Sequence, residues 1–141
     1  MSEAVKEVAR KVRPEFRNIH AMKDLPNYRL PPAGWVSILH RVSGAGLFLL
    51  LPFLLYLFEL SVRSEISFDY FRGIISHTLV KVILLGLIWA YMQHFCAGVR
   101  HLFMDVHLAI EKDSSRNSAI AVLTVSLLLT AIAGLKLFGV F

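Results

Sequence analysis

A serine and an arginine share one helical face at the start of a long apolar segment. Residues 37–44 read SILHRVSG, and four residues separate Ser37 from Arg41. In a helix these side chains project from the same face, with Gly44 about one turn further along. A hydroxyl and a cation just inside a membrane boundary can hydrogen-bond a polar ligand. The alternative is that Arg41 extends its charge to lipid headgroups.

A second polar stripe lies on a later apolar segment. Residues 94–101 read HFCAGVRH, and His94, Gly98, His101 and Asp105 recur at intervals of four, three and four, which places them on one helical face. An imidazole deep in a membrane is costly without a partner, so it marks a functional candidate. Haem iron is one such partner, and Gly98 would leave room for a flat macrocycle. The alternative is an interhelical hydrogen bond for His94 and close helix packing at Gly98.

The spacing of the histidines restricts how they could bind one haem. His94 and His101 lie on the same side of one helix, so they cannot ligate opposite faces of the same macrocycle. His94 lies about 24 Å along its helix from Thr78, whereas His40 lies within about a turn and a half of the start of its own segment. On this count His40 is the shallower of the two. We therefore predict that a second axial histidine comes from a separate subunit.

Three segments are long and apolar enough to hold these residues in a membrane: about 36 to 60, about 78 to 103 and about 118 to 140. The chain has 141 residues, of which 56% are apolar and 18% charged. Its apolar residues are dense rather than alternating, which argues against membrane strands. The sequence predicts an all-α integral membrane fold, with residues 1–35 as an N-terminal segment and 36–141 as a three-helix anchor domain. Residues 113–118 are predicted to form a polar connection, with Ser118 capping the third span.

Basic residues concentrate before the first span, and they predict the orientation of the chain. By the positive-inside rule the N-terminus is cytoplasmic and the C-terminus lies outside. The same asymmetry explains the net charge of +5 through anionic lipid rather than nucleic acid. No removable signal peptide is evident, and the single Cys96 can neither close an intrachain disulfide nor hold an iron–sulfur cluster. The basic residues are Lys6, Arg10, Lys11, Arg13, Arg17, Lys23, Arg29 and Arg41.

With this topology, polar side chains from the first two spans meet at one membrane level. Such a cluster can hydrogen-bond a quinone carbonyl, supply protons to its reduced oxygens, or pair with haem propionates. The residues expected there are Ser37, His40, Arg41, Arg100, His101 and Asp105.

The motifs SILHRVSG and HFCAGVRHLFMD, in this order, resemble the cytochrome b membrane-anchor subunits of the succinate:quinone oxidoreductase (complex II) family. The Arg13-Pro14 pair is also similar to the N-terminal segment of that family, whereas the stretch from Phe16 to Gly34 is longer than its pattern. The resemblance implies a subunit of the bacterial cytoplasmic membrane that pairs with a second small anchor subunit. It also implies an iron–sulfur subunit and a flavoprotein at the cytoplasmic face, and reduction of ubiquinone.

The resemblance further implies roles for individual residues. Ser37 and Arg41 match the quinone site, and His94 matches the axial ligand of haem b, whose other ligand comes from the partner anchor. His40 is expected near the haem propionates. Arg41, Gly98 and His101 are expected in the haem surroundings, on the spacing and membrane level described above rather than on the resemblance. Asp105 and Glu111 match acidic positions that could give protons access to the site. Two alternatives stay open: a haem-free quinone anchor of the same family, and a structural or transport subunit without redox function.

Overall fold

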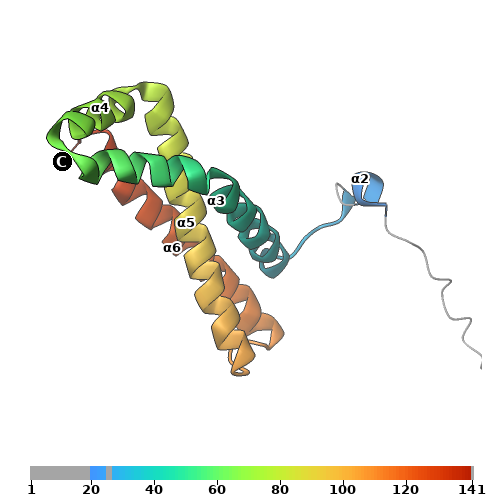
Figure 1. Cartoon of the computed structure of the whole chain (residues 1–141). Coiled ribbons are helices and arrows are strands. Elements are labelled where there is room, and N and C mark those ends of the chain that lie inside the picture. The colour runs from blue at the N-terminus through green and yellow to red at the C-terminus, as the bar shows by residue number, and fades with distance from the viewer. Residues whose placement is uncertain (1–19, 25–26, 141) are drawn as a thin grey trace, which may run out of the picture.

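The structure is a computed structural model that describes residues 20–24 and 27–140. Its helices are α2 (Ala21–Asp24), α3 (Pro32–Arg63), α4 (Glu65–Ser76), α5 (Thr78–Asp105) and α6 (Lys112–Leu137) (Figure 1). No strand occurs among these residues, and α3, α5 and α6 are long and apolar enough to cross a membrane. The predicted all-α fold with three transmembrane helices is confirmed. The Arg13-Pro14 pair and the first five N-terminal basic residues lie outside the described residues.

Helix α3 has 32 residues, which corresponds to about 48 Å and exceeds the roughly 30 Å of a bilayer core. It begins at Pro32, earlier than the sequence predicts, because proline is preorganised for the first helical position and loses no hydrogen bond there. Pro52 lies inside the helix, where its ring cannot donate the usual backbone hydrogen bond. Figure 1 shows α3 changing direction along its length as it crosses α5, and we assign this bend to Pro52.

The connection between the first two spans is itself a helix, which the sequence does not predict. Helix α4 begins with a reciprocal capping box, in which the Ser64 hydroxyl accepts from the Ser67 backbone N–H and the Ser67 hydroxyl accepts from the Ser64 backbone N–H. The helix contacts α3 and α5 without burying any residue completely, and Ile66 and Tyr70 are exposed. In Figure 1 the helix lies at the same end of the bundle as the C-terminal end of α6.

Helices α5 and α6 pack through small and polar side chains. Ser126, Thr130 and Gly134 are all buried and recur every fourth residue along α6, which lets the two backbones approach closely. The Ser126 hydroxyl donates to the side-chain oxygen of the fully buried Gln93 at 2.8 Å. This contact fixes the rotation of α5 against α6, and with it the direction in which the neighbouring His94 points.

Helix α6 begins six residues earlier than predicted, at Lys112, with Glu111 as its N-cap. The prediction that residues 113–118 form a connection capped by Ser118 is therefore wrong. The first turn is closed by the Ser115 backbone N–H, which donates to the Glu111 carbonyl at 2.7 Å. Ser118 instead turns its hydroxyl toward a side chain of α5, as described below.

Candidate functional site

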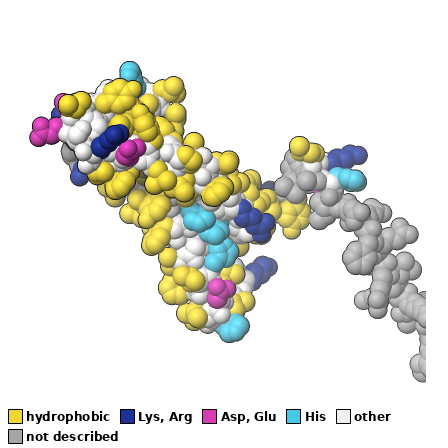
Figure 2. Space-filling view, viewed as in Figure 1, with side chains coloured by type: hydrophobic (Ala, Val, Ile, Leu, Met, Phe, Trp, Pro, Cys, Tyr) yellow, Lys and Arg dark blue, Asp and Glu magenta, His cyan; other side chains and the backbone are white. Residues whose placement is uncertain are grey.

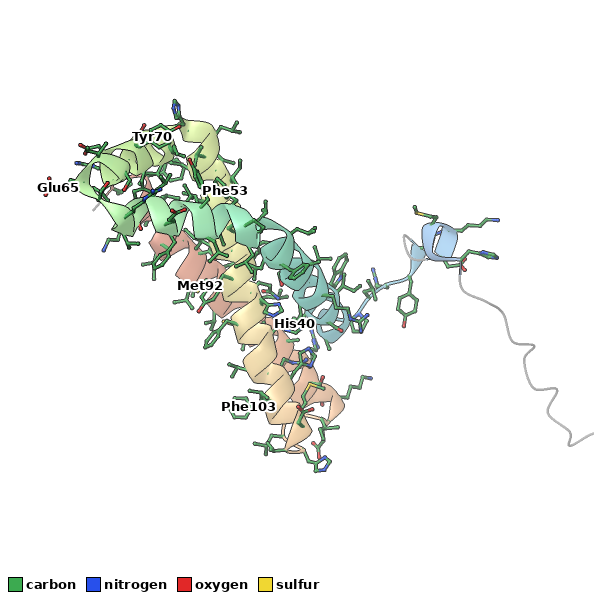
Figure 3. All side chains as sticks on the ribbon, viewed as in Figure 1. His40, Phe53, Glu65, Tyr70, Met92 and Phe103 are labelled. Atoms are coloured by element: carbon green, nitrogen blue, oxygen red, sulfur yellow. The ribbon has the colours of Figure 1, made fainter. Side chains whose placement is uncertain are left out.

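Three imidazoles meet where α3 crosses α5. The rings of His40 and His94 stack with centroids 4.1 Å apart and an interplanar angle of 11°, and the His101 ring is tilted against His40 at 5.0 Å. All three side chains are half-buried. Figure 3 labels His40 beside α5, and Figure 2 shows imidazoles gathered on this face next to α3. The cluster thus joins residues from both sequence motifs.

The stacking overturns one premise of the sequence analysis, which placed His40 at a shallower level than His94. Two rings with centroids 4.1 Å apart lie at the same level of the bundle. Counting residues from each helix end failed because α3 starts earlier than predicted and crosses α5 at an angle. Depth along one helix does not measure depth along another that is tilted against it.

The stacked pair cannot enclose a metal ion between its two rings. The lone pairs of ring nitrogens lie in the ring planes, whereas the two imidazoles here turn their faces toward each other. In this arrangement His40 does not supply an opposite axial ligand to His94. A second ligand from another subunit stays a prediction.

The hydrogen bonds of His94 decide which of its nitrogens carries the proton. Nδ1 of His94 lies 3.0 Å from the backbone carbonyl oxygen of His40. A carbonyl oxygen only accepts hydrogen bonds, so the Nδ1 hydrogen must point toward it. In the neutral ring Nε2 is then unprotonated and presents its lone pair. A histidine whose other nitrogen donates to a backbone carbonyl is the usual state of a metal ligand.

Two glycines let the backbones approach this cluster. A Cβ atom placed on Gly44 would lie 2.8 Å from Cε1 of His94, closer than real Cβ contacts come, so only glycine lets α3 sit against this ring. A Cβ on Gly98 would lie 3.7 Å from Nε2 of His40, an ordinary van der Waals distance. Gly44, rather than Gly98, is therefore the glycine that holds the imidazole in place. Room for a macrocycle over Gly98 stays a prediction.

Ser37 and Arg41 lie on α3 near the imidazoles. Ser37 is half-buried one turn before Arg41, and Arg41 is exposed directly after His40. In the described part of the chain neither side chain has a hydrogen-bond partner. Both polar groups are thus available to a ligand or to lipid headgroups, and the predicted quinone contact stays a prediction.

The two acidic candidates lie at the end of the bundle where α5 leads into α6. Asp105 is the last residue of α5, about one turn beyond His101, and Glu111 is the N-cap of α6. Both are exposed. The structure therefore brings them to one end of the bundle without placing either carboxylate against the imidazoles.

Arg100 departs from its predicted position, because it does not join the histidine cluster. Its side chain is 5% exposed and turns toward α6, where Nε donates to the Ser118 hydroxyl at 3.0 Å. Its Nη2 donates to the Ser115 hydroxyl at 2.9 Å and to the Ser115 carbonyl at 3.4 Å. His101, the next residue along the helix, takes the cluster face instead, since adjacent helical residues point about 100° apart.

We expect loss of the two hydroxyls to destabilise the bundle more than loss of Arg100 itself. The double variant Ser115→Ala/Ser118→Ala leaves the buried guanidinium with only the Ser115 carbonyl, 3.4 Å from Nη2, as an acceptor, and should cost about 3 kcal/mol in free energy of unfolding. Arg100→Met removes the charge, and the serines can bond their own helix carbonyls. Chemical denaturation in detergent measures the free energy of unfolding of both variants, with Ser114→Ala, a change at an exposed serine, as the control. A larger loss in Arg100→Met would contradict this account.

Sequence reasoning missed Ser43, although it belongs to the first motif. Ser43 is buried, and its hydroxyl donates to the His40 carbonyl at 3.0 Å and lies 3.4 Å from Nδ1 of His94. Its place three residues after His40 puts both on neighbouring positions of one face, which was a usable signal. What the spacing could not reveal is that this face meets His94.

Comparison with known proteins agrees with the two motifs. Residues 17–133 match the model of the family described as the succinate dehydrogenase/fumarate reductase transmembrane subunit. The chain is 34% identical to the succinate dehydrogenase cytochrome b556 subunit of Coxiella burnetii, over 79% of this chain and 90% of that protein. It is 32% identical to the subunit of the same name from Paracoccus denitrificans, over 81% of this chain and 87% of that protein. The chain therefore belongs to the transmembrane cytochrome b subunits of the succinate dehydrogenase/fumarate reductase family.

Proposed function

We propose that this chain binds haem b through His94 and forms part of a ubiquinone-reduction site with Ser37 and Arg41. The observation that carries the haem assignment is the 3.0 Å contact between Nδ1 of His94 and the His40 carbonyl. With the hydrogen of the neutral ring on Nδ1, Nε2 carries the lone pair that an iron ligand needs inside a membrane-spanning bundle. The names of the relatives, which are cytochrome b556 subunits, support the same cofactor.

The residues around His94 fit a haem in their chemistry as well. Bound haem would supply a one-electron carrier inside the membrane. His40 and Arg41, adjacent on α3, would hold its propionates, while Gly98 and His101 would line its surroundings. The second axial histidine would come from the partner anchor subunit, because His40 is stacked on His94 rather than opposed to it.

The proposed quinone chemistry needs hydrogen-bond donors and protons rather than a nucleophile. Reduction of ubiquinone to ubiquinol takes up two electrons and two protons, and a carbonyl oxygen that gains charge is stabilised by a hydroxyl and a cation. Ser37 and Arg41 supply these donors from one face of α3. Asp105 and Glu111, exposed at the α5–α6 end of the bundle, are the candidates for proton supply.

The electrons for this reaction would come from other subunits. We propose an assembly of this chain with a second small anchor, an iron–sulfur subunit and a flavoprotein. The N-terminus would face the cytoplasm of a bacterial cell, with the C-terminus on the opposite side of the inner membrane. The proposal predicts that an affinity-tagged chain brings a flavoprotein and an iron–sulfur protein with it from solubilised membranes. Purification without either would favour the structural or transport alternative.

A spectrum of the purified complex tests the haem assignment. Reduction with dithionite should produce the Soret and α bands of a b-type cytochrome. A haem-free anchor, in which His94 merely packs against His40, would show no such bands even in cells replete with haem. That outcome would remove haem from the proposed function and leave only the quinone site.

We expect Ser37→Ala to impair quinone reduction while leaving haem in place. Loss of one hydrogen bond to the quinone carbonyl should lower quinone reductase activity by about tenfold, equivalent to about 1.4 kcal/mol. The assay is succinate-driven quinone reduction in membranes, with haem content measured in the same preparation. Ser61→Ala, at the opposite end of the same helix, is the control. Unchanged quinone kinetics in Ser37→Ala would remove Ser37 from the site.

A further inference from the structure

Three polar atoms meet at a single point between α3 and α5. The backbone carbonyl oxygen of His40 lies 3.0 Å from Nδ1 of His94 and 3.0 Å from the Ser43 hydroxyl. Ser43 is only 3% exposed, so water cannot easily take the place of either contact. The third side of the triangle, from the Ser43 oxygen to Nδ1, is longer at 3.4 Å.

The protons in this triangle can be assigned from its geometry. Nδ1 of His94 donates to the carbonyl, because two acceptors would not stay 3.0 Å apart. The Ser43 hydroxyl has a single hydrogen, and its shortest contact is to the same carbonyl. The His40 carbonyl therefore accepts from both donors, which compete for its electron density.

We propose that Ser43 tunes the reduction potential of the iron bound at His94, as a positioning residue that touches neither iron nor quinone. The more strongly a carbonyl pulls on the Nδ1 proton, the more basic the ligating nitrogen becomes. A more basic ligand stabilises the ferric iron relative to the ferrous iron. Because the Ser43 hydroxyl also donates to this carbonyl, it weakens the hydrogen bond from Nδ1. Ser43 thereby raises the reduction potential of the iron. The inference rests on the proposed haem-binding function.

A purely structural role for Ser43 is the competing explanation. Serine hydroxyls in helices often bond the carbonyl three or four residues earlier, with only a local effect on the helix. Helix α3 offers an internal comparison, because the Ser61 hydroxyl donates to the Phe58 carbonyl at 2.7 Å in the same i to i−3 pattern. Ser61 lies about five helical turns from Ser43 and far from the imidazoles. If loss of any serine–carbonyl hydrogen bond in α3 changed the reduction potential, alanine variants of Ser43 and Ser61 should change it equally.

The test is a redox titration of the haem in the purified complex, followed by its α band. Ser43→Ala should lower the midpoint potential, Ser43→Thr should keep it near the wild-type value, and Ser61→Ala should leave it unchanged. If the alanine variant loses its haem, the pair Ser43→Thr and Ser43→Val gives the comparison, since these side chains match in shape and differ by the hydroxyl. The valine variant should then have the lower potential.

Two results would overturn the inference. One is a haem-containing Ser43→Ala or Ser43→Val complex with the wild-type potential, and the other is a shift of equal size in Ser61→Ala. Either result would leave haem binding by His94 intact. Absence of b-type bands from the wild-type complex would instead overturn the proposed haem function itself, so the two failures are distinguishable.

Discussion

Replacement of His94 by leucine should remove the haem from the complex. Leucine fills a similar volume but offers no nitrogen to the iron, and loss of an axial ligand leaves the remaining contacts too weak to hold the macrocycle in a fixed position. The reduced-minus-oxidised spectrum of the purified complex should then lack its b-type α band. The amount of this chain in the membrane, measured on an immunoblot, separates lost haem from lost protein.

Two further histidine variants sharpen the His94 result. His77→Leu alters a histidine at the junction of α4 and α5, far from the cluster, and should retain full haem content. His40→Leu keeps the backbone carbonyl that accepts from Nδ1 of His94, so haem should remain, bound less tightly if the propionates lose a partner. Loss of the b-type bands in His40→Leu but not in His94→Leu would reverse the assignment of the ligand.

A methyl group on Gly44 should displace the His94 ring and strongly lower the haem content of the complex. The added Cβ in Gly44→Ala would lie 2.8 Å from Cε1 of His94, so either the His94 ring moves out of its position or α3 and α5 move apart. Overpacking of this kind costs about 1–3 kcal/mol. Changes around a metal ligand typically reduce metal affinity by about 10–100-fold, and we expect a comparable loss of bound haem.

Gly46 provides a matched control for the Gly44 variant. It lies two residues further along α3, where an added Cβ meets no atom within 4 Å. Gly46→Ala makes the same gain in helix propensity without the clash, so haem content should stay at the wild-type level. Equal haem loss in both variants would mean that haem binding depends on the flexibility of α3 rather than on its contact with His94.

The transmembrane helices could be predicted because their signal is local. A continuous apolar stretch of adequate length predicts a spanning helix whatever surrounds it, and all three such helices occur in the structure. Their ends were less accurate. Helix α3 starts early because of its prolines, and α6 starts early because Arg100 holds Ser115 and Ser118 against α5.

Helix α4 was missed for a related reason. Its 12 residues are too few for a span, and the helix is supported by the Ser64–Ser67 capping box and by its contacts with α3 and α5. A serine pair three residues apart is a weak signal in the sequence alone. The same limit applies to Ser43, which looks like any other serine in a helix until His94 is placed beside it.

The sequence by itself determined the helical faces of this protein. The 3.6-residue period puts Ser37 with Arg41, and His94 with Gly98 and His101, without reference to any other part of the chain. Only the tertiary structure decided that His40 stacks on His94, that the His40 carbonyl fixes the proton of His94, and that Arg100 faces α6. These contacts depend on how two helices are tilted and rotated against each other. That geometry is set partly by the local bend at Pro52. It is also set by the close approach of Gly44 to His94 and by the Gln93–Ser126 hydrogen bond, which join residues far apart in the chain.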